Sequence, residues 1–263
     1  MKMHRELFYI SEKTLCQAEQ KMSLLDALRR IFKPTPEEKA DKLQEKVSNM
    51  YGQTADRRYY LDQLAAMGPE LAPRRLITRF TVRCDNGTND SDEKELTKCL
   101  LVGLGRASVE PLKQFLRKHD KDFNWPYRTL EELVTRQELT DFVVELLESI
   151  GPDYVRNPER KEQLILVVKS FQDDAVGRAL LPYLGDDNET IRFVAADAVI
   201  THGHAYGIEA LAGRFGVETS QRVLTLIAES FRDREWTVPE ACRAKVGESL
   251  PSGFRMNSAG RIV

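Results

Sequence analysis

The chain has 263 residues, of which 41% are hydrophobic and 30% are charged, a composition typical of a globular or repeat protein. A formal net charge of −2 excludes a whole-molecule field that would attract it to nucleic acid or to an anionic membrane. Its four cysteines show no CxxC spacing, which favours reduced thiols over a disulfide framework or a zinc site. No continuous run of about 20 apolar residues and no apolar leader occurs, which favours a cytoplasmic protein.

Residues 1–52 are predicted to form an N-terminal helical cap. Residues 22–32 (MSLLDALRRIF) have the apolar spacing of a short amphipathic helix, and residues 37–50 have that of a charged helix. Capping is favoured because the apolar end of a repeat array must be covered, although the helix at 22–32 could instead dock on a partner or a membrane. Because Met22 directly precedes this helix, we hypothesise that it is an alternative initiator and that residues 1–21 are dispensable for folding.

Residues 53–238 are predicted to fold as helices in pairs. The clearest pair is 176–203, where apolar residues recur at helical spacing on both sides of the polar stretch DDNET. Gly203 is a predicted left-handed helix stop. Three junctions each join a helix end to a new apolar helix through a glycine: AAMGPELAPRRLITRF, VGLGRASVEPLKQFL and ITHGHAYGIEALAGRF. A period of roughly 30–45 residues with two helices per unit predicts an all-α fold, an α-solenoid of stacked antiparallel helix pairs.

The predicted boundaries of these helices come from capping residues. Asp186 with Glu189 and Thr129 with Glu132 have the spacing of capping boxes, and Ser108 is a predicted N-cap. After the helices, residues 239–263 are predicted to be a C-terminal tail. Its last stretch, FRMNSAGRIV, could be a weak hairpin or a loose end.

Within the clearest pair, LLPYLGDDNETIRFVAADAVITHG resembles a HEAT repeat. The run LPYL at 181–184 matches the Leu-x-Pro-x-Leu-like run of that family, and Asp186 and Arg192 match its aspartate and arginine. The resemblance implies an armadillo-type superhelix in which Asp186 and Arg192 bond within or between repeats and have a structural role. It is strongest over 176–203, extends over 56–117 and 205–231, and is weakest over 120–172.

Two clusters raise the question of a metal site, and for both the sequence favours another interpretation. His202 and His204 could begin a site, but their only nearby acids are Asp197 and Glu209, so a polar turn is favoured. The acidic segment 85–95 (DNGTNDSDEKE) lacks the glycine and the glutamate that a calcium loop needs at its sixth and twelfth positions. This segment is predicted to be a loop between helices.

No motif of a catalytic site or of a nucleotide-binding loop is found. GLGRAS at 103–108 contains two glycines, but it joins helix to helix and follows no predicted strand. We therefore predict no enzyme, no cofactor and no metal. One alternative is a lyase-type enzyme, because the HEAT-like resemblance extends to chromophore lyases of light-harvesting proteins.

A second alternative is nucleic-acid binding by an arginine cluster. Arg57, Arg58, Arg75 and Arg79 lie on neighbouring predicted helices and could contact phosphates. The second helix of each pair carries mixed charge, however, whereas a groove that follows a phosphate backbone should be basic along its length. The charged residues predicted to be exposed there include Glu93, Glu138, Lys94, Lys98 and Lys161.

The favoured function is a non-catalytic scaffold or adaptor that holds a protein or peptide partner on the concave face. Exposed aromatic and arginine side chains are typical anchors of such contacts, and the candidates are Tyr59, Tyr60, Trp125, Tyr127 and Arg222. Two of them belong to the predicted loop DFNWPY at 122–127. This loop either offers its aromatic side chains to a partner or buries them where the repeat spacing widens.

Overall fold

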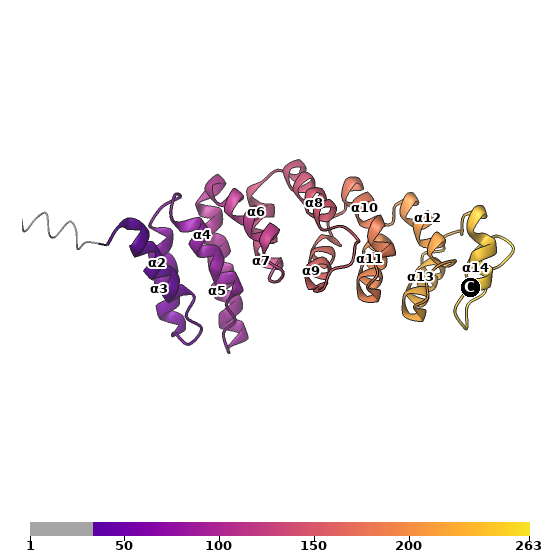
Figure 1. The fold of residues 1–263 in the computed structure, drawn as a ribbon, viewed down its shortest axis with the longest axis horizontal. Helices are drawn as coiled ribbons and strands as arrows, with labels where there is room; N and C mark the ends of the chain where they lie inside the picture. The colour runs from indigo at the N-terminus through magenta and orange to yellow at the C-terminus, as the bar shows by residue number, and fades with distance from the viewer. Residues whose placement is uncertain (1–33) are drawn as a thin grey trace, which may run out of the picture.

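A computed structural model describes residues 34–263, and every regular element in this range is a helix (Figure 1). The predicted all-α class is therefore confirmed. The predictions for residues 1–21, for Met22 and for the helix at 22–32 lie outside the described residues. The α-helices are α2 Pro36–Val47, α3 Thr54–Ala65, α4 Ala72–Leu76, α5 Gly87–Gly103, α6 Val109–Lys118, α7 Asn124–Leu133, α8 Arg136–Ile150, α9 Glu159–Val168, α10 Asp174–Leu180, α11 Glu189–His202, α12 Ala205–Arg214, α13 Gln221–Asp233 and α14 Arg243–Ser249. Short 3-10 helices are η1 Ile77–Thr81, η2 Gly105–Ser108, η3 Leu181–Gly185 and η4 Glu240–Cys242.

The helices follow one another along one long axis in two layers (Figure 1). In the first layer α3, α5, α7, α9, α11 and α13 lie side by side, and each contacts the next. This layer lines the hollow side of a shallow arch, and we call it the inner layer (Figure 1). The outer layer holds α2, α4, α6, α8, α10, α12 and α14. The chain alternates between the layers, so that each outer helix from α2 to α12 pairs with the inner helix that follows it, and α14 closes the series.

Apolar side chains at helical spacing form the core between the two layers. In the pair formed by α10 and α11, Val176, Leu180, Ile191 and Ala195 are each 0% exposed, as their spacing predicts. Burying one of the larger side chains contributes about 1.5–3 kcal/mol relative to leaving it in water. Because α11 also packs on α9 and α13, a large part of this burial is supplied by neighbouring pairs.

The cap of α8 differs from the sequence prediction. Thr129 lies inside α7, where its hydroxyl donates to the Trp125 carbonyl at 2.7 Å, so the predicted box of Thr129 with Glu132 is wrong. The capping box is formed instead by Thr135 and Glu138 at the start of α8. The two boxes have the same sequence spacing, and only the second coincides with a change from extended to helical backbone.

The start of α11 also lies later than predicted. Asn188 is its N-cap, and the predicted box of Asp186 with Glu189 is wrong; the Asp186 carboxylate accepts from the Asn188 N–H at 2.8 Å. Ser108 occupies the N-cap position of α6, as predicted, but its side chain makes no capping hydrogen bond, because its hydroxyl donates to the Leu101 carbonyl at 2.7 Å.

The helix stop at Gly203 is confirmed. This residue follows α11 with a φ of 67°, in the left-handed region that glycine adopts without strain. The turn that it forms brings the end of α11 close to the start of α12.

The segment predicted to be a C-terminal tail packs against the helices. It contains η4 and α14 and ends in a short antiparallel return, with isolated bridges between Met256 and Ile262 and between Thr237 and Arg261. Val246 is 0% exposed and Ile262 is 3% exposed. Of the two alternatives for FRMNSAGRIV, the structure therefore has the hairpin.

Candidate binding surface

Two of the four candidate phosphate-binding arginines are buried inside the stack. Arg57 and Arg79 are 3% and 0% exposed, and both donate to the carboxylate of Glu93, which is itself 0% exposed. The N–O distances are 2.9 and 2.8 Å from Arg57 and 2.9 Å from Arg79. The phosphate-contact prediction for these two arginines is therefore wrong, and so is the predicted exposure of Glu93.

The electrostatics of this cluster favour the ionised form of the Glu93 carboxyl group over the protonated form. Burial alone would raise the pKa of its carboxyl group, but the hydrogen bonds and charges of Arg57 and Arg79 outweigh burial and hold the pKa below its ordinary value. The hydrogen bonds that Arg57 donates to Glu93 in turn raise the pKa of Arg57. The cluster is a buried group of two arginines and one glutamate that joins α3, η1 and α5.

The acidic segment 85–95 is helical from Gly87 onward, so its prediction as a loop is wrong. Asn86 caps α5 by accepting from the Asn89 N–H at 3.1 Å. Asp90 then accepts from Arg79 and pairs with Lys94, both at 2.8 Å. Three lysines predicted to be exposed are likewise buried: Lys94, Lys98 and Lys161.

The other two arginines of the cluster lie nearer the surface and are paired with carboxylates of neighbouring helices. Arg58 lies 3.5 Å from Asp92 on α5, and Arg75 lies 2.7 Å from Asp41 on α2. The four arginines therefore connect helices to one another and do not line a continuous basic groove.

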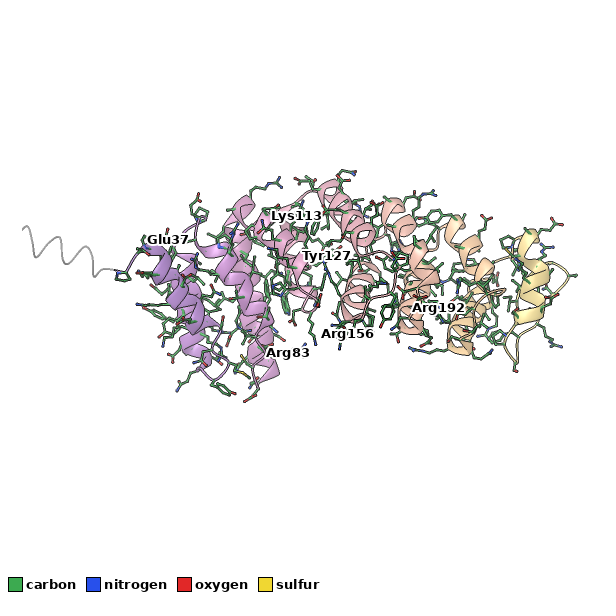
Figure 2. The ribbon with its side chains drawn as sticks, viewed as in Figure 1. Glu37, Arg83, Lys113, Tyr127, Arg156 and Arg192 are labelled. Carbon is green, nitrogen blue, oxygen red and sulfur yellow. The ribbon has the colours of Figure 1, made fainter. Side chains whose placement is uncertain are left out.

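The aromatic side chains of the segment 122–127 lie largely inside the protein. Its residues from Asn124 onward belong to α7, so the predicted loop is shorter than expected. Tyr127 is 7% exposed, and Figure 2 shows it inside the stack, while burial raises the pKa of its phenol. Trp125 is half-buried and stacks on Phe80 at a centroid distance of 6.4 Å. Tyr127 is therefore not available as a partner anchor, and its prediction as one is wrong.

The remaining candidate anchors lie on the inner layer. Tyr59 on α3 is 60% exposed, and its ring meets the half-buried ring of Tyr60 edge to face at 5.5 Å. Arg222 on α13 is exposed, and its guanidinium lies 3.7 Å from the centroid of Phe193 on α11. Leu166 on α9, which the sequence did not single out, is 45% exposed.

Ion pairs run between successive helices of the inner layer. Three of them join a basic side chain on or directly after one helix to an acidic side chain of the next, and the fourth runs from α13 back to α11; each has at least one partly exposed member. They are Arg58 with Asp92, Lys98 with Glu132, Lys169 with Asp197, and Arg222 with Glu189. Much of the charge of this layer is therefore neutralised within the protein.

Asp186 and Arg192, the candidate repeat residues, bond across the boundaries between helix pairs. The Asp186 carboxylate accepts from Lys161 Nζ of α9 at 2.7 Å, with both side chains almost fully buried. Arg192 donates to both carboxylate oxygens of Glu218 at 2.9 Å and to the Asp186 carbonyl at 2.9 Å. Burial alone would raise the pKa of Glu218, but hydrogen bonds led by those from Arg192 lower it to about 2.

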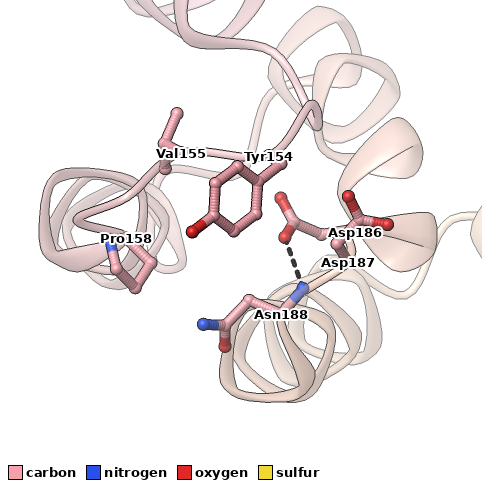
Figure 3. Close-up of a pocket in the computed structure, with 6 residues that line it drawn as sticks. All are labelled: Tyr154, Val155, Pro158, Asp186, Asp187 and Asn188. Carbon is pink, nitrogen blue, oxygen red and sulfur yellow. Dashed lines mark hydrogen bonds between the residues drawn. The ribbon is translucent and has the colours of Figure 1, made fainter.

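Three hollows border the connection between α8 and α9, at residues 151–158. The smallest, about 180 Å³, lies between the Tyr154 ring and the turn at 186–188 that precedes α11 (Figure 3). The other two, of about 510 and 530 Å³, lie on either side of the end of α8. Tyr154 is 75% exposed, and Arg156 lies at the edge of the stack (Figure 2). The sequence signal for this feature is an aromatic residue in the irregular stretch GPDYVRNP.

The acids considered as further metal ligands do not join the two histidines. Asp197 pairs with Lys169, which directly follows α9. Among residues 34–263, no group of three or more His, Cys, Asp and Glu side chains is placed to hold a metal ion.

No family model, curated protein or solved structure matches this chain. The resemblance to HEAT repeats therefore stays a prediction. In the part of the chain that the structure describes, none of the helices has the length and apolar character needed to cross a membrane.

Proposed function

We propose that this protein is a non-catalytic scaffold, built as a HEAT-like α-solenoid, which holds a protein or peptide partner on the exposed side of the inner layer. The alternation of two helix layers along one axis supports the solenoid, because the contacts run between neighbouring pairs. Lys161–Asp186 and Arg192–Glu218 support it further, since each joins one pair to the next. A cytoplasmic location is part of the same proposal.

The main support for a protein partner is the charge balance of the inner layer. Its ion pairs already neutralise many of the charges at its surface, so it offers little net charge to a phosphate backbone. Tyr59 and Leu166 are more than two-fifths exposed on helices of this layer, and Phe193 lies under Arg222. Exposed aromatic and apolar side chains on a rigid surface suit the anchoring of a protein.

Affinity purification of the tagged full-length protein from its native cells, with nuclease added, tests this function. The test variant is Tyr59→Ala combined with Leu166→Ala, which removes two exposed side chains and buries no new group. Val217→Ala is the matched control, because Val217 is 63% exposed but lies in the turn between α12 and α13.

We expect a stoichiometric partner with the native protein and with Val217→Ala. Its recovery with the double variant should fall by about tenfold or more, since loss of an anchor typically costs 2 kcal/mol or more. Equal recovery with all three proteins would contradict the proposed face. Recovery that disappears on nuclease treatment would contradict a protein partner.

No specific contact favours the two alternative functions. Arg57 and Arg79 are buried against Glu93, which removes half of the arginine cluster proposed for nucleic acid. For the lyase-type enzyme, the described residues provide no arrangement to which a reaction step can be assigned.

A further inference from the structure

The turn between α11 and α12 brings two imidazole rings together. His202 is the last residue of α11 and is 8% exposed, while His204 immediately precedes α12. Their ring centroids are 6.0 Å apart with an interplanar angle of 67°. The left-handed backbone of Gly203 makes this approach possible.

Hydrogen bonding assigns the protons on His202. Its Nε2 lies 3.4 Å from the Val168 carbonyl oxygen, which can only accept, so Nε2 carries the proton and Nδ1 has a free lone pair. A neutral imidazole whose other N–H donates to a backbone carbonyl is the form in which histidine binds metals.

Two buried ring nitrogens have no hydrogen-bond partner among residues 34–263. They are His202 Nδ1 and His204 Nε2. Buried polar atoms in folded proteins are nearly always bonded to protein or to a bound species, so a pair of unpartnered atoms on adjacent rings needs an explanation. Because His202 is more than nine-tenths buried, bulk water does not explain its Nδ1.

Gly177 of α10 shows where the groups converge. A Cβ atom at this position would lie 3.2 Å from His202 Nδ1 and 3.2 Å from His204 Cδ2, the carbon bonded to Nε2. It would also clash with Tyr206 Oη. Any residue other than glycine at this position would fill the space between these side chains with its Cβ atom. The atoms that border the space come from α10, α11 and the start of α12.

We propose that His202 Nδ1 and His204 Nε2 bind one transition-metal ion of the class that imidazole prefers, with Zn²⁺ as the first candidate and Tyr206 Oη as a neighbouring third ligand. Zn–N bonds of about 2.0–2.1 Å to each ring account for much of the 6.0 Å between the centroids. The Tyr206 hydroxyl donates to the Asp174 carbonyl at 3.1 Å, which leaves its oxygen lone pairs available. The bound ion would fasten α10, α11 and α12 together. This inference is independent of the proposed partner-binding face.

The test uses the full-length protein, freed of metal with a chelator and titrated with ZnCl₂ alone by calorimetry. We expect one equivalent of Zn²⁺ per chain. His204→Ala should weaken Zn²⁺ binding by about tenfold or more. The control is His119→Ala, because His119 is exposed and stacks on Phe115, and this variant should bind Zn²⁺ as the native protein does. No binding by the native protein, or equal binding by His204→Ala, overturns the proposal.

A second variant separates metal binding from folding. Tyr206→Phe keeps the ring that stacks on His204 at 5.1 Å and removes only the oxygen. We expect it to fold and to bind Zn²⁺ more weakly than the native protein, with a smaller rise in melting temperature on adding ZnCl₂. If ZnCl₂ leaves the melting temperature of the native protein unchanged, the ion does not hold the three helices together, and this part of the proposal is wrong.

Discussion

At the scale of single residues, several charged side chains are part of the core. Glu93 is fully buried because Arg57, which lies 36 residues earlier, and Arg79 both reach it. Sequence periodicity marks such a glutamate as surface-facing, since it counts apolar positions within one helix and carries no information on a partner from another. The sequence identified the arginines as a cluster, but their role depends on Glu93, which the sequence did not connect with them.

Replacing Glu93 by glutamine should destabilise the protein strongly. Glu93→Gln removes the negative charge that two buried guanidinium groups share, and breaking such a buried pair costs roughly 3–5 kcal/mol. We expect a loss of about 3 kcal/mol in the free energy of unfolding, measured by urea denaturation followed by circular dichroism.

Asp92→Asn is the matched control for this prediction. Asp92 is the preceding residue on α5, pairs with Arg58 at 3.5 Å and has a side chain that is 57% exposed. A surface ion pair of this kind contributes about 0–1 kcal/mol, so the control should remain close to the native protein. Similar losses for both variants would show that the Glu93 cluster does not stabilise the fold.

At the scale of elements, helix pairs were predictable where the apolar spacing is regular. The helices of 176–203 follow their apolar spacing, and the stop at Gly203 is where it was expected. Over 120–172 the spacing is irregular because the connection between α8 and α9 is long, at 151–158, and because α7 begins inside a stretch predicted to be a loop. The three hollows that border this irregular connection could not be derived from a repeat pattern.

Helix starts were less predictable than helix faces. Thr129 with Glu132 and Thr135 with Glu138 fit the same sequence pattern, and Asp186 and Asn188 are both common N-cap residues. Lys161 settles the second case, since it holds Asp186 in an ion pair outside α11 and Asn188 takes the capping position.

Loss of the Asn188 cap should weaken α11. Its side chain accepts from the Thr190 N–H at 2.9 Å, so Asn188→Ala should lower the free energy of unfolding by about 1 kcal/mol. The control is Asp187→Ala, because Asp187 is exposed and its carboxylate has no bonded partner among residues 34–263. That change should stay within about 0.5 kcal/mol of the native protein. If thermal and urea unfolding give the reverse order, Asn188 is not the cap.

At the scale of the whole molecule, the proposed function separates the contacts that stabilise the stack from the surface that would bind a partner. Buried side chains between the layers and buried ion pairs between successive helix pairs hold the stack together. The exposed side of the inner layer keeps apolar groups that this chain does not cover, such as Leu166. In the solenoid that we propose, this surface would lie on rigid helices, as a scaffold requires.

The central claim is that a partner binds the inner layer, and hydrogen–deuterium exchange of the full-length protein tests it most directly. Exchange would be compared with and without the partner recovered by affinity purification. We predict slower amide exchange in α3, α9, α11 and α13, where Tyr59, Leu166, Phe193 and Arg222 lie, with α4, α8 and α12 little changed. Protection confined to α4, α8 and α12, or absent from both layers, would contradict the account.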